Sequence, residues 1–453
     1  MDWLTLLPPA VAIVVAVWKK DVIISLLAAL FTGELILTGF NPATAFLAVF
    51  ERIVAVFASA SNTRVLMFSL LIGALLSLIK KSGGVAAFVA WVTHLGFAQS
   101  KRKVSSVPAL LGVIIFIETN LSILTAGFIA RDLFDKVKMS RARLAYIIDS
   151  TCAPICVIIL FNAWGATILG LISDFPLSSP VETLVWSIPY NLYSWLTLLL
   201  VFYTVWSGRV FGSMKVAEQQ QVKISADEKD SENASRLSLM LVPLLTLIVG
   251  IIFFMGYTGD GEILQGDGGK SVLWAVALAC LVAFTLIRVL TPDTRLVKMV
   301  KWSFDGMSDL LPLVITVLLA LALGASMKSL GTGQFVAQLV SDNLPLWSVP
   351  ALVFIAGGIM SFTTGTSWGT FSILIPIGMP IALASGIPAE IILAAILGGS
   401  VFGDHCSPIS DTTIVSSLAA GCDHLTHVKT QLPYALFTGG LTVVGFLIIG
   451  GLR

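Results

Sequence analysis

Long apolar runs separated by short polar stretches occupy almost the whole chain. A helix needs about 20 mainly apolar residues to cross the hydrocarbon core of a bilayer. We therefore expect transmembrane helices near residues 4–18, 22–39, 64–79, 144–170, 183–206, 237–257, 271–290, 309–327, 388–420 and 433–451. The pattern predicts an all-α polytopic membrane protein.

Two further apolar segments, 104–130 and 348–385, are predicted to be re-entrant hairpins. Basic residues flank the first segment on both sides, at Lys101–Lys103 and between Arg131 and Arg143. Because Lys and Arg mark cytoplasmic loops, both ends of this segment should lie on the cytoplasmic side. Its counterpart has few basic neighbours and should enter the membrane from outside.

The composition fits a chain that is surrounded by lipid. Hydrophobic residues make up 57% of the 453 positions and charged residues 12%, whereas soluble domains carry about 25% charged residues. Such a chain cannot cover a water-facing surface. The net charge of +1 comes without a basic block, so no nucleic-acid partner is expected. No cofactor is predicted, and the five cysteines show neither a disulfide framework nor a CxxC metal pattern.

The hydrophilic stretch 207–236 divides the chain into two halves, 1–206 and 237–453, that resemble each other. Short matches occur in the same order in both halves, and they pair Ser106–Leu110 with Ser348–Leu352 and Cys152–Ile155 with Cys406–Ile409. We predict about five transmembrane helices, one re-entrant hairpin and one broken helix in each half. Five is an odd number, so the halves should be inverted repeats, which are typical of secondary transporters.

The distribution of charge predicts the orientation of the chain. With the loop 207–236 in the cytoplasm, only five of the 27 Lys and Arg residues lie outside, namely Arg52, Arg64, Lys270, Lys328 and Arg453. The positive-inside rule favours this arrangement. It places both termini outside.

The tips of the two hairpins carry oxygen-rich side chains that suit a sodium ion. These residues are Glu118, Thr119, Asn120, Thr364, Thr366 and Ser367. Hydroxyl, amide and freed carbonyl oxygens at a helix break can replace part of the water shell of Na⁺, and half-helix termini add a favourable dipole. Thr, Asn and Gly are also ordinary turn residues, so a capped turn is the alternative interpretation.

Two predicted crossings are interrupted by proline, at Pro154 and Pro408, and carboxylates lie near both breaks. Asp149 lies near the first break, and Asp404 and Asp411 flank the second. A charge at the centre of a membrane helix costs about 3 kcal/mol or more, so such residues are normally retained for binding. A buried carboxylate holds Na⁺ when ionised or a proton when neutral, and this competition is sufficient for antiport. A structural pair or a helix cap is the alternative.

The second break adds His405 and Ser407 as polar candidates. His405 is either a proton shuttle or a hydrogen-bonded structural histidine. We predict a sodium site formed by Asn120, Thr366, Ser367 and Asp404. By contrast, we interpret the downstream residues Asp423, His424 and His427 as a solvated polar loop.

The segments Phe402–Thr413 and Gly421–Tyr434 resemble the NhaC-type sodium/proton antiporter family, and Gly365–Thr370 and Leu6–Ile13 are similar to it as well. The resemblance implies a prokaryotic inner-membrane secondary transporter of the ion-transporter superfamily, which includes divalent-anion/sodium symporters. In those symporters, hairpin tips with the sequence Ser-Asn-Thr bind sodium and substrate, and one domain moves as an elevator. Neither tip here has that sequence, so dicarboxylate binding does not carry over. A homodimer is expected by analogy.

We therefore predict a sodium/proton antiporter, not an enzyme, in which Asp149, Asp404 and Asp411 bind Na⁺ or H⁺ in competition during elevator-type alternating access. The alternative is a sodium- or proton-coupled transporter of an amino acid or a small organic acid. An intramembrane metal enzyme built on Asp404, His405 and the downstream histidines is disfavoured, because no nucleophile and base accompany them.

Overall fold

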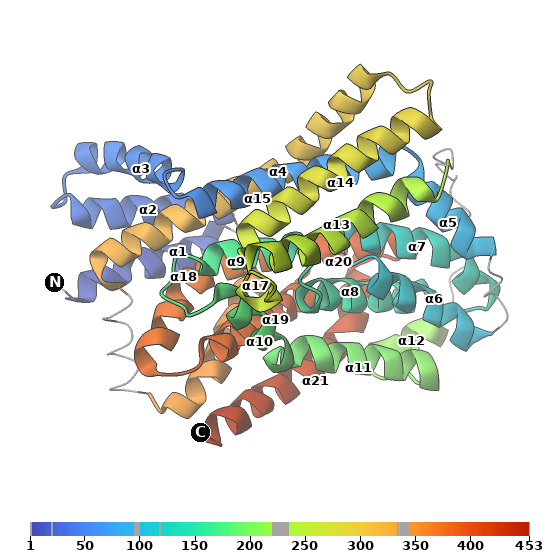
Figure 1. Cartoon of the computed structure of the whole chain (residues 1–453). Coiled ribbons are helices and arrows are strands. Elements are labelled where there is room, and N and C mark those ends of the chain that lie inside the picture. Colours follow the sequence, from blue (N-terminus) through green and yellow to red (C-terminus); the bar gives the residue numbers. More distant parts are fainter. Residues whose placement is uncertain are drawn as a thin grey trace.

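The computed structural model describes residues 2–19, 21–94, 100–116, 119–219, 235–332, 335 and 344–452, and within these ranges the regular structure is helical. The helices form two layers, which lie one above the other in Figure 1. Three short 3₁₀ helices, Asp2–Leu6, Ile263–Gln265 and Leu346–Ser348, connect or precede them.

The first layer contains the helices that flank the site without supplying its polar side chains. It consists of α1 (Leu7–Lys19), α2 (Val22–Leu37), α3 (Pro42–Val56), α4 (Ala60–Lys81), α5 (Gly84–His94), α13 (Ser238–Thr258), α14 (Gly268–Leu290) and α15 (Leu296–Leu330). Helix α15 contacts α2 and α4, and α14 contacts α4 and α13. The contacts of α15 with α2 and α4, and of α14 with α4, join helices that lie far apart in the sequence.

The second layer contains both hairpins and both broken crossings. It consists of α6 (Lys101–Ile114), α7 (Thr119–Lys136), α8 (Arg141–Ile158), α9 (Ala163–Ile172), α10 (Pro180–Tyr190), α11 (Leu192–Ser207), α12 (Ser213–Gln219), α17 (Val349–Thr364), α18 (Ser367–Ser385), α19 (Ala389–Cys406), α20 (Asp411–Ala420) and α21 (His424–Gly451). Helix α19 contacts α17, α18 and α21, and α20 contacts α7 and α8. Helices α9 and α18 also contact the first layer, through α4 and α15 respectively.

The helices confirm a polytopic membrane protein. Among the described residues, 8 helices are long and apolar enough to cross a membrane, or up to 11 spans if each of three bent helix pairs counts as one. The predicted hairpins appear as α6 with α7 and as α17 with α18. Helix α12 lies in the predicted loop 207–236, of which residues 220–234 are outside the described ranges.

One predicted break is displaced along the chain. Pro408 lies between α19 and α20 as predicted, but Pro154 lies inside α8, and that crossing bends by 46° between Ile158 and Ala163. The side chain of Asn162 explains the position. Its Nδ2 donates to the carbonyls of Cys156 and Ile159 at 2.7 Å each, and its Oδ1 accepts from the backbone N–H of Gly165 at 3.0 Å. The crossing therefore breaks where a side chain satisfies the exposed backbone groups.

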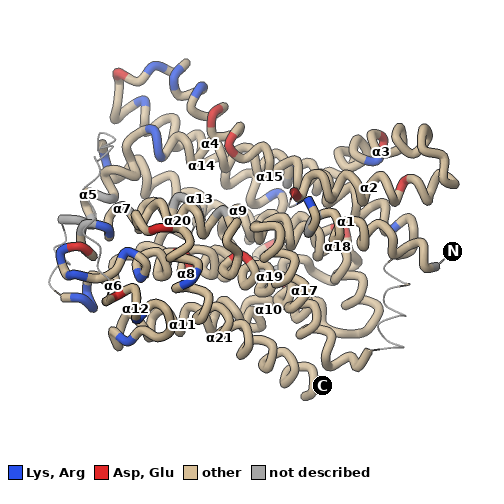
Figure 2. Tube along the Cα trace, turned by 180° about the vertical axis from the view of Figure 1, so that it is seen from behind, with Lys and Arg blue, Asp and Glu red and all other residues tan. Residues whose placement is uncertain are grey.

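Charged residues are unevenly distributed between the two ends of the bundle. Figure 2 shows most Lys and Arg near α5, α6 and α12 and in the connections at that end, whereas both termini lie toward the other end. The element order after α4 and after α15 is similar, with a hairpin followed by a broken crossing in each half. The division into two inverted repeats stays a prediction.

Helices α4 and α15 cross closely at two glycines. A Cβ added to Gly306 would lie 2.1 Å from the carbonyl oxygen of Gly73, and one added to Gly73 would lie 2.3 Å from the carbonyl oxygen of Gly306. We expect Gly306→Ala to force the two helices apart and destabilise the protein by about 1–3 kcal/mol, as overpacking does. Thermal unfolding of the detergent-purified protein would show a lower midpoint.

The matched control for Gly306→Ala is Gly440→Ala, because an added Cβ at Gly440 of α21 has open space around it. Replacing glycine by alanine in a helix is otherwise favourable by about 0.5–1 kcal/mol. Equal unfolding midpoints for the two variants would show that the crossing of α4 and α15 tolerates a wider separation.

Candidate functional site

The first helix break meets the tip of the second hairpin in the second layer, near its contact with the first layer. Trp164 in the first turn of α9 and Trp368 in the first turn of α18 have ring centroids 4.7 Å apart, and Phe371 lies 5.5 Å from Trp164. Asn162 caps α9 and Thr366 caps α18. The N-termini of two short helices therefore lie close together, and each contributes partial positive charge.

Asp404 lies at the second break and is completely buried. Helix α19 ends two residues later, at Cys406, because Ser407 is extended and Pro408 cannot continue the helix. The carboxylate Oδ2 accepts hydrogen bonds from the hydroxyls of Ser367 and Thr412, both at 3.2 Å. Asp404 and its two hydroxyl partners therefore come from three elements: the end of α19, the start of α20 and the start of α18.

Glycine brings the second hairpin tip against this break. Gly365 has a φ of +69°, and an added Cβ would lie 2.4 Å from the carbonyl oxygen of Ile409. Only glycine combines this left-handed backbone with such a close approach. The close contact positions Ser367 beside Asp404.

The other predicted hydroxyls at this break bond to nearby backbone. Thr364 donates to the carbonyl of Met360 at 2.9 Å, and Ser407 donates to that of Phe362 at 2.7 Å. Thr366 accepts from the N–H of Gly369 as the cap of α18. Of the predicted sodium ligands, the structure therefore brings Ser367 and Asp404 together.

The first hairpin tip is described only in part. Thr119 begins α7 and accepts a hydrogen bond from the indole Nε1 of Trp164 at 3.2 Å. Glu118 lies outside the described residues. Asn120 and Asp411 have described backbones, in α7 and at the start of α20, but their side chains lie outside the description.

Asp149 lies in the middle of α8, is completely buried, and accepts hydrogen bonds from two other helices. From α20, Ser416 donates to Oδ1 at 3.2 Å and Thr413 donates to Oδ2 at 3.3 Å. From α21, Gln431 Nε2 donates to Oδ2 at 2.6 Å, and His427 Nε2 lies 3.4 Å from the same oxygen. The site therefore holds two separate buried carboxylates.

The interpretation of His427 as part of a solvated loop is wrong, because its side chain is completely buried against Asp149. His427 and Gln431 are four residues apart, so they lie on one face of α21. This spacing in an apolar segment could have identified both residues as inward-facing. His424, by contrast, is half-buried and bonds to the carbonyl of Pro408 and to Ser417.

His405 follows Asp404 in α19 and contacts Gln431, a partner of Asp149. Its carbonyl oxygen accepts from Gln431 Nε2 at 3.1 Å, and its Nδ1 lies 3.0 Å from the hydroxyl of Tyr193 in α11. The imidazole is buried. No group of three or more His, Cys, Asp or Glu side chains in the described ranges is placed to hold a metal ion.

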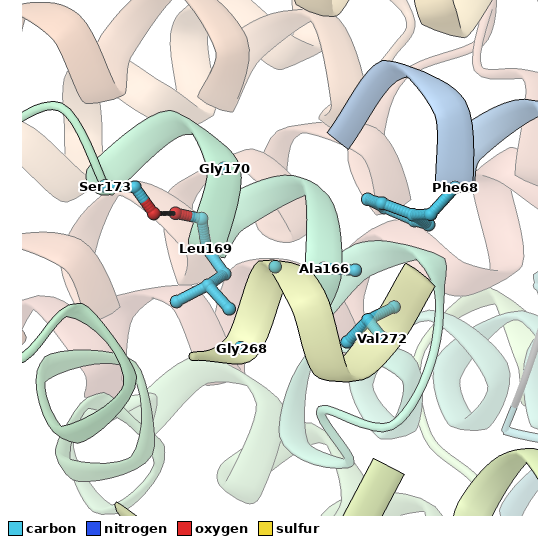
Figure 3. A pocket seen from close by; sticks show the side chains of 8 residues that line it. Phe68, Ala166, Leu169, Gly170, Ser173, Gly268 and Val272 are labelled. Carbon is cyan, nitrogen blue, oxygen red and sulfur yellow. Dashed lines mark hydrogen bonds between the residues drawn. The ribbon is translucent and has the colours of Figure 1, made fainter. Parts of the chain in front are cut away.

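Two hollows lie away from the carboxylates. A gap of about 10 Å³ between α4, α9 and α14 has room for about one water molecule. Phe68, Leu169 and Val272 are among the residues that line it (Figure 3). A larger cavity of about 700 Å³ separates α15 from the end of α9 and from α18. Its wall is mainly apolar but includes Lys328 and Asp174.

Buried carboxylates at interrupted helices inside a bundle of apolar helices define a polytopic membrane transporter. A solved structure, the YdaH transporter of Alcanivorax borkumensis, has a similar fold, with a TM-score of 0.61, 14% identity, and coverage of 90% of this chain and 88% of that chain. The topology of that transporter is described as unusual.

The model of the Na⁺/H⁺ antiporter family matches residues 155–451, and the chain belongs to this family. An uncharacterised protein of Haemophilus influenzae is 32% identical over 98% of this chain and 90% of its own length. The Na⁺/H⁺ antiporter NhaC of Alkalihalophilus pseudofirmus is 30% identical over 32% of each chain. The malate-2H⁺/Na⁺-lactate antiporter of Bacillus subtilis is 33% identical over 30% of this chain and 29% of its own. The predicted NhaC-type family is confirmed.

Proposed function

We propose that this protein exchanges Na⁺ for H⁺ across a prokaryotic inner membrane, with Na⁺ bound at Asp404. One observation carries the proposal: a fully buried carboxylate accepts hydrogen bonds from the hydroxyls of Ser367 and Thr412, where a hairpin tip meets a helix break. Membership of the Na⁺/H⁺ antiporter family supports it.

The chemistry of these groups suits an alkali cation. An ionised carboxylate in a low-dielectric interior is stable only with a compensating charge, and a bound Na⁺ supplies that charge at Asp404. Hydroxyls can rotate, so Ser367 and Thr412 can turn their oxygens toward Na⁺ or their hydrogens toward the carboxylate. Asn120 and Thr366 remain proposed as further ligands.

We also propose that the second layer moves against the first as an elevator. Asp149, Asp404 and the hydrogen-bond partners named above belong to the second layer, so the site can move as one body. The end of the bundle that is rich in Lys and Arg would face the cytoplasm, and both termini would lie outside.

A sodium pulse tests the exchange directly. We expect that adding Na⁺ outside liposomes that contain the protein and an internal pH dye raises the internal pH, without any organic solute. The direction follows because Na⁺ entering the liposome drives H⁺ out. A pulse of K⁺ or choline at the same ionic strength is the control. A dye signal that appears only when an organic acid is added would reject antiport of these two ions.

A second function, sodium-coupled transport of a small organic acid or an amino acid, is favoured by the cavity of about 700 Å³ beside α15. This volume lies within the range of small-molecule sites, and Lys328 could attract a carboxylate. The Bacillus subtilis relative is named for malate and lactate. Thermal stabilisation of the purified protein by lactate, malate or alanine, beyond that given by NaCl, would support this function.

A further inference from the structure

Three buried polar atoms around Asp149 have no hydrogen-bond partner among the described residues. They are His427 Nδ1, His405 Nε2 and Gln431 Oε1. Buried polar atoms are nearly always paired, so unpaired atoms grouped in one place mark a position where protons or water are exchanged. The Asp404 carboxylate, by comparison, accepts hydrogen bonds from the hydroxyls of Ser367 and Thr412.

The partners of Asp149 fit a proton better than a sodium ion. Gln431 Nε2 lies between two acceptors, Asp149 Oδ2 and the carbonyl of His405, so its amide must point its hydrogens toward the carboxylate. A cation at Oδ2 would meet these hydrogens and the imidazole of His427. A proton on the carboxylate or on the imidazole needs no such space.

We propose that Asp149 and His427 form the proton-binding site, separate from the sodium site at Asp404, and that Thr413 couples the two sites. This inference rests on the proposed Na⁺/H⁺ exchange and assigns its two ions to different residues. One proton moves between water and the Asp149–His427 pair in each cycle. No redox or covalent step is involved.

The titratable groups that face Asp149 come from three elements. His427 of α21 contacts it directly, and His405 of α19 interacts with it electrostatically. Behind them, Tyr193 of α11 bonds to His405, and the thiol of Cys406 lies near Tyr193.

Thr413 lies between the carboxylate of Asp149 and the backbone carbonyl of Asp404, and it has a single hydroxyl proton. Its Oγ1 lies 3.3 Å from Asp149 Oδ2 and 3.4 Å from the carbonyl oxygen of Asp404. The hydroxyl can donate fully to only one of them. A sodium ion that binds at Asp404 and attracts that carbonyl leaves the hydroxyl to donate to Asp149. Because a donated hydrogen bond favours the ionised carboxylate, sodium binding then promotes release of the proton from Asp149.

Two flux measurements on the reconstituted protein separate the sites. Exchange of radioactive Na⁺ for unlabelled Na⁺ at equal concentrations needs only the sodium site, whereas the dye signal after a sodium pulse needs both. We expect Thr413→Val and His427→Gln to lower the dye signal by about tenfold or more, the effect of losing a hydrogen bond to a charged group. Sodium exchange should stay within about twofold of wild type, because the residues around Asp404 are unchanged.

Conservative variants distinguish coupling from structural damage. Thr413→Ser keeps the hydroxyl and should retain both activities, and Lys429→Gln, an exposed change on the same helix as His427, should behave as wild type. His427→Gln should also shift the pH dependence of the dye signal, which a purely structural residue would not do.

Each outcome decides the inference. A wild type without any sodium-driven dye signal would overturn the proposed function itself. If Thr413→Val and His427→Gln give the same sodium-driven dye signal as wild type, only the separate proton site is overturned. Loss of sodium exchange in well-folded Asp149→Asn would show that both ions share Asp149. If a variant does not reconstitute, the same distinction can be made in detergent. Adding Na⁺ to the purified wild type should release protons. Asp149→Asn should lose this proton release while it still binds radioactive Na⁺.

Discussion

Asp404→Asn is expected to abolish sodium-driven proton movement in liposomes, by about 100-fold or more. The substitution keeps the size of the side chain but removes the negative charge that Ser367 and Thr412 face. At the effective dielectric of a protein, a charge pair about 4 Å apart contributes about 4 kcal/mol, which corresponds to a loss of affinity of at least that factor. Binding of radioactive Na⁺ to the purified protein should be lost together with transport.

Asp423→Asn is the matched control for Asp404→Asn. Asp423 is an exposed carboxylate that caps α21, where it accepts from the backbone N–H of Thr426 at 2.9 Å. Asparagine caps helices about as well as aspartate, so both stability and transport should persist. Sodium binding that survives in Asp404→Asn at the wild-type affinity would place the sodium ion elsewhere.

Gly365→Ala is expected to damage the second layer through both its backbone conformation and its packing. The left-handed backbone costs a non-glycine residue about 1–2 kcal/mol, and the added Cβ would lie 2.4 Å from the carbonyl of Ile409. The tip must therefore move away from the break, and Ser367 moves with it away from Asp404. We expect sodium affinity to fall by about tenfold or more and the unfolding midpoint to drop.

Gly386→Ala separates the two causes of this effect. Gly386 ends α18 with a φ of +72°, but an added Cβ there has no atom within 4 Å. This variant should show the conformational penalty alone, with a small drop in unfolding midpoint and unchanged sodium affinity. Similar sodium affinities for the two variants would mean that the contact between the hairpin tip and the break does not position the ligands.

The sequence could predict most of the helices because bilayer-spanning segments follow from apolar length alone. The hairpin at 104–130 was recognisable from its basic flanks, and Pro408 marked a true break. Pro154 does not mark a break, because a proline inside a helix can remove one hydrogen-bond donor without ending the helix. The break near Asn162 depends instead on a side-chain amide that satisfies the carbonyls of Cys156 and Ile159. Pattern alone does not show which polar side chain will do this.

Both buried carboxylates of the candidate site, Asp149 and Asp404, could be predicted from the sequence, but the partners of Asp149 could not. Asp404 and Ser367 were chosen from local breaks, and the structure brings them together. The environment of Asp149 depends on α21, since His427 and Gln431 are 278 and 282 residues away along the chain. Contacts over such distances depend on how the helices assemble, and a single sequence gives only the spacing of His427 and Gln431 on their own helix.

The cavity between α15 and α18 has a consequence for pharmacology. It lies between the two layers, and neither Asp149 nor Asp404 lines it. Its wall is mainly apolar and includes the charged residues Lys328 and Asp174. If the second layer slides past the first, as proposed, a drug-sized molecule wedged there would hold the layers in one position. Such an inhibitor would reduce the maximal rate without competing with sodium, so raising the sodium concentration would not restore activity.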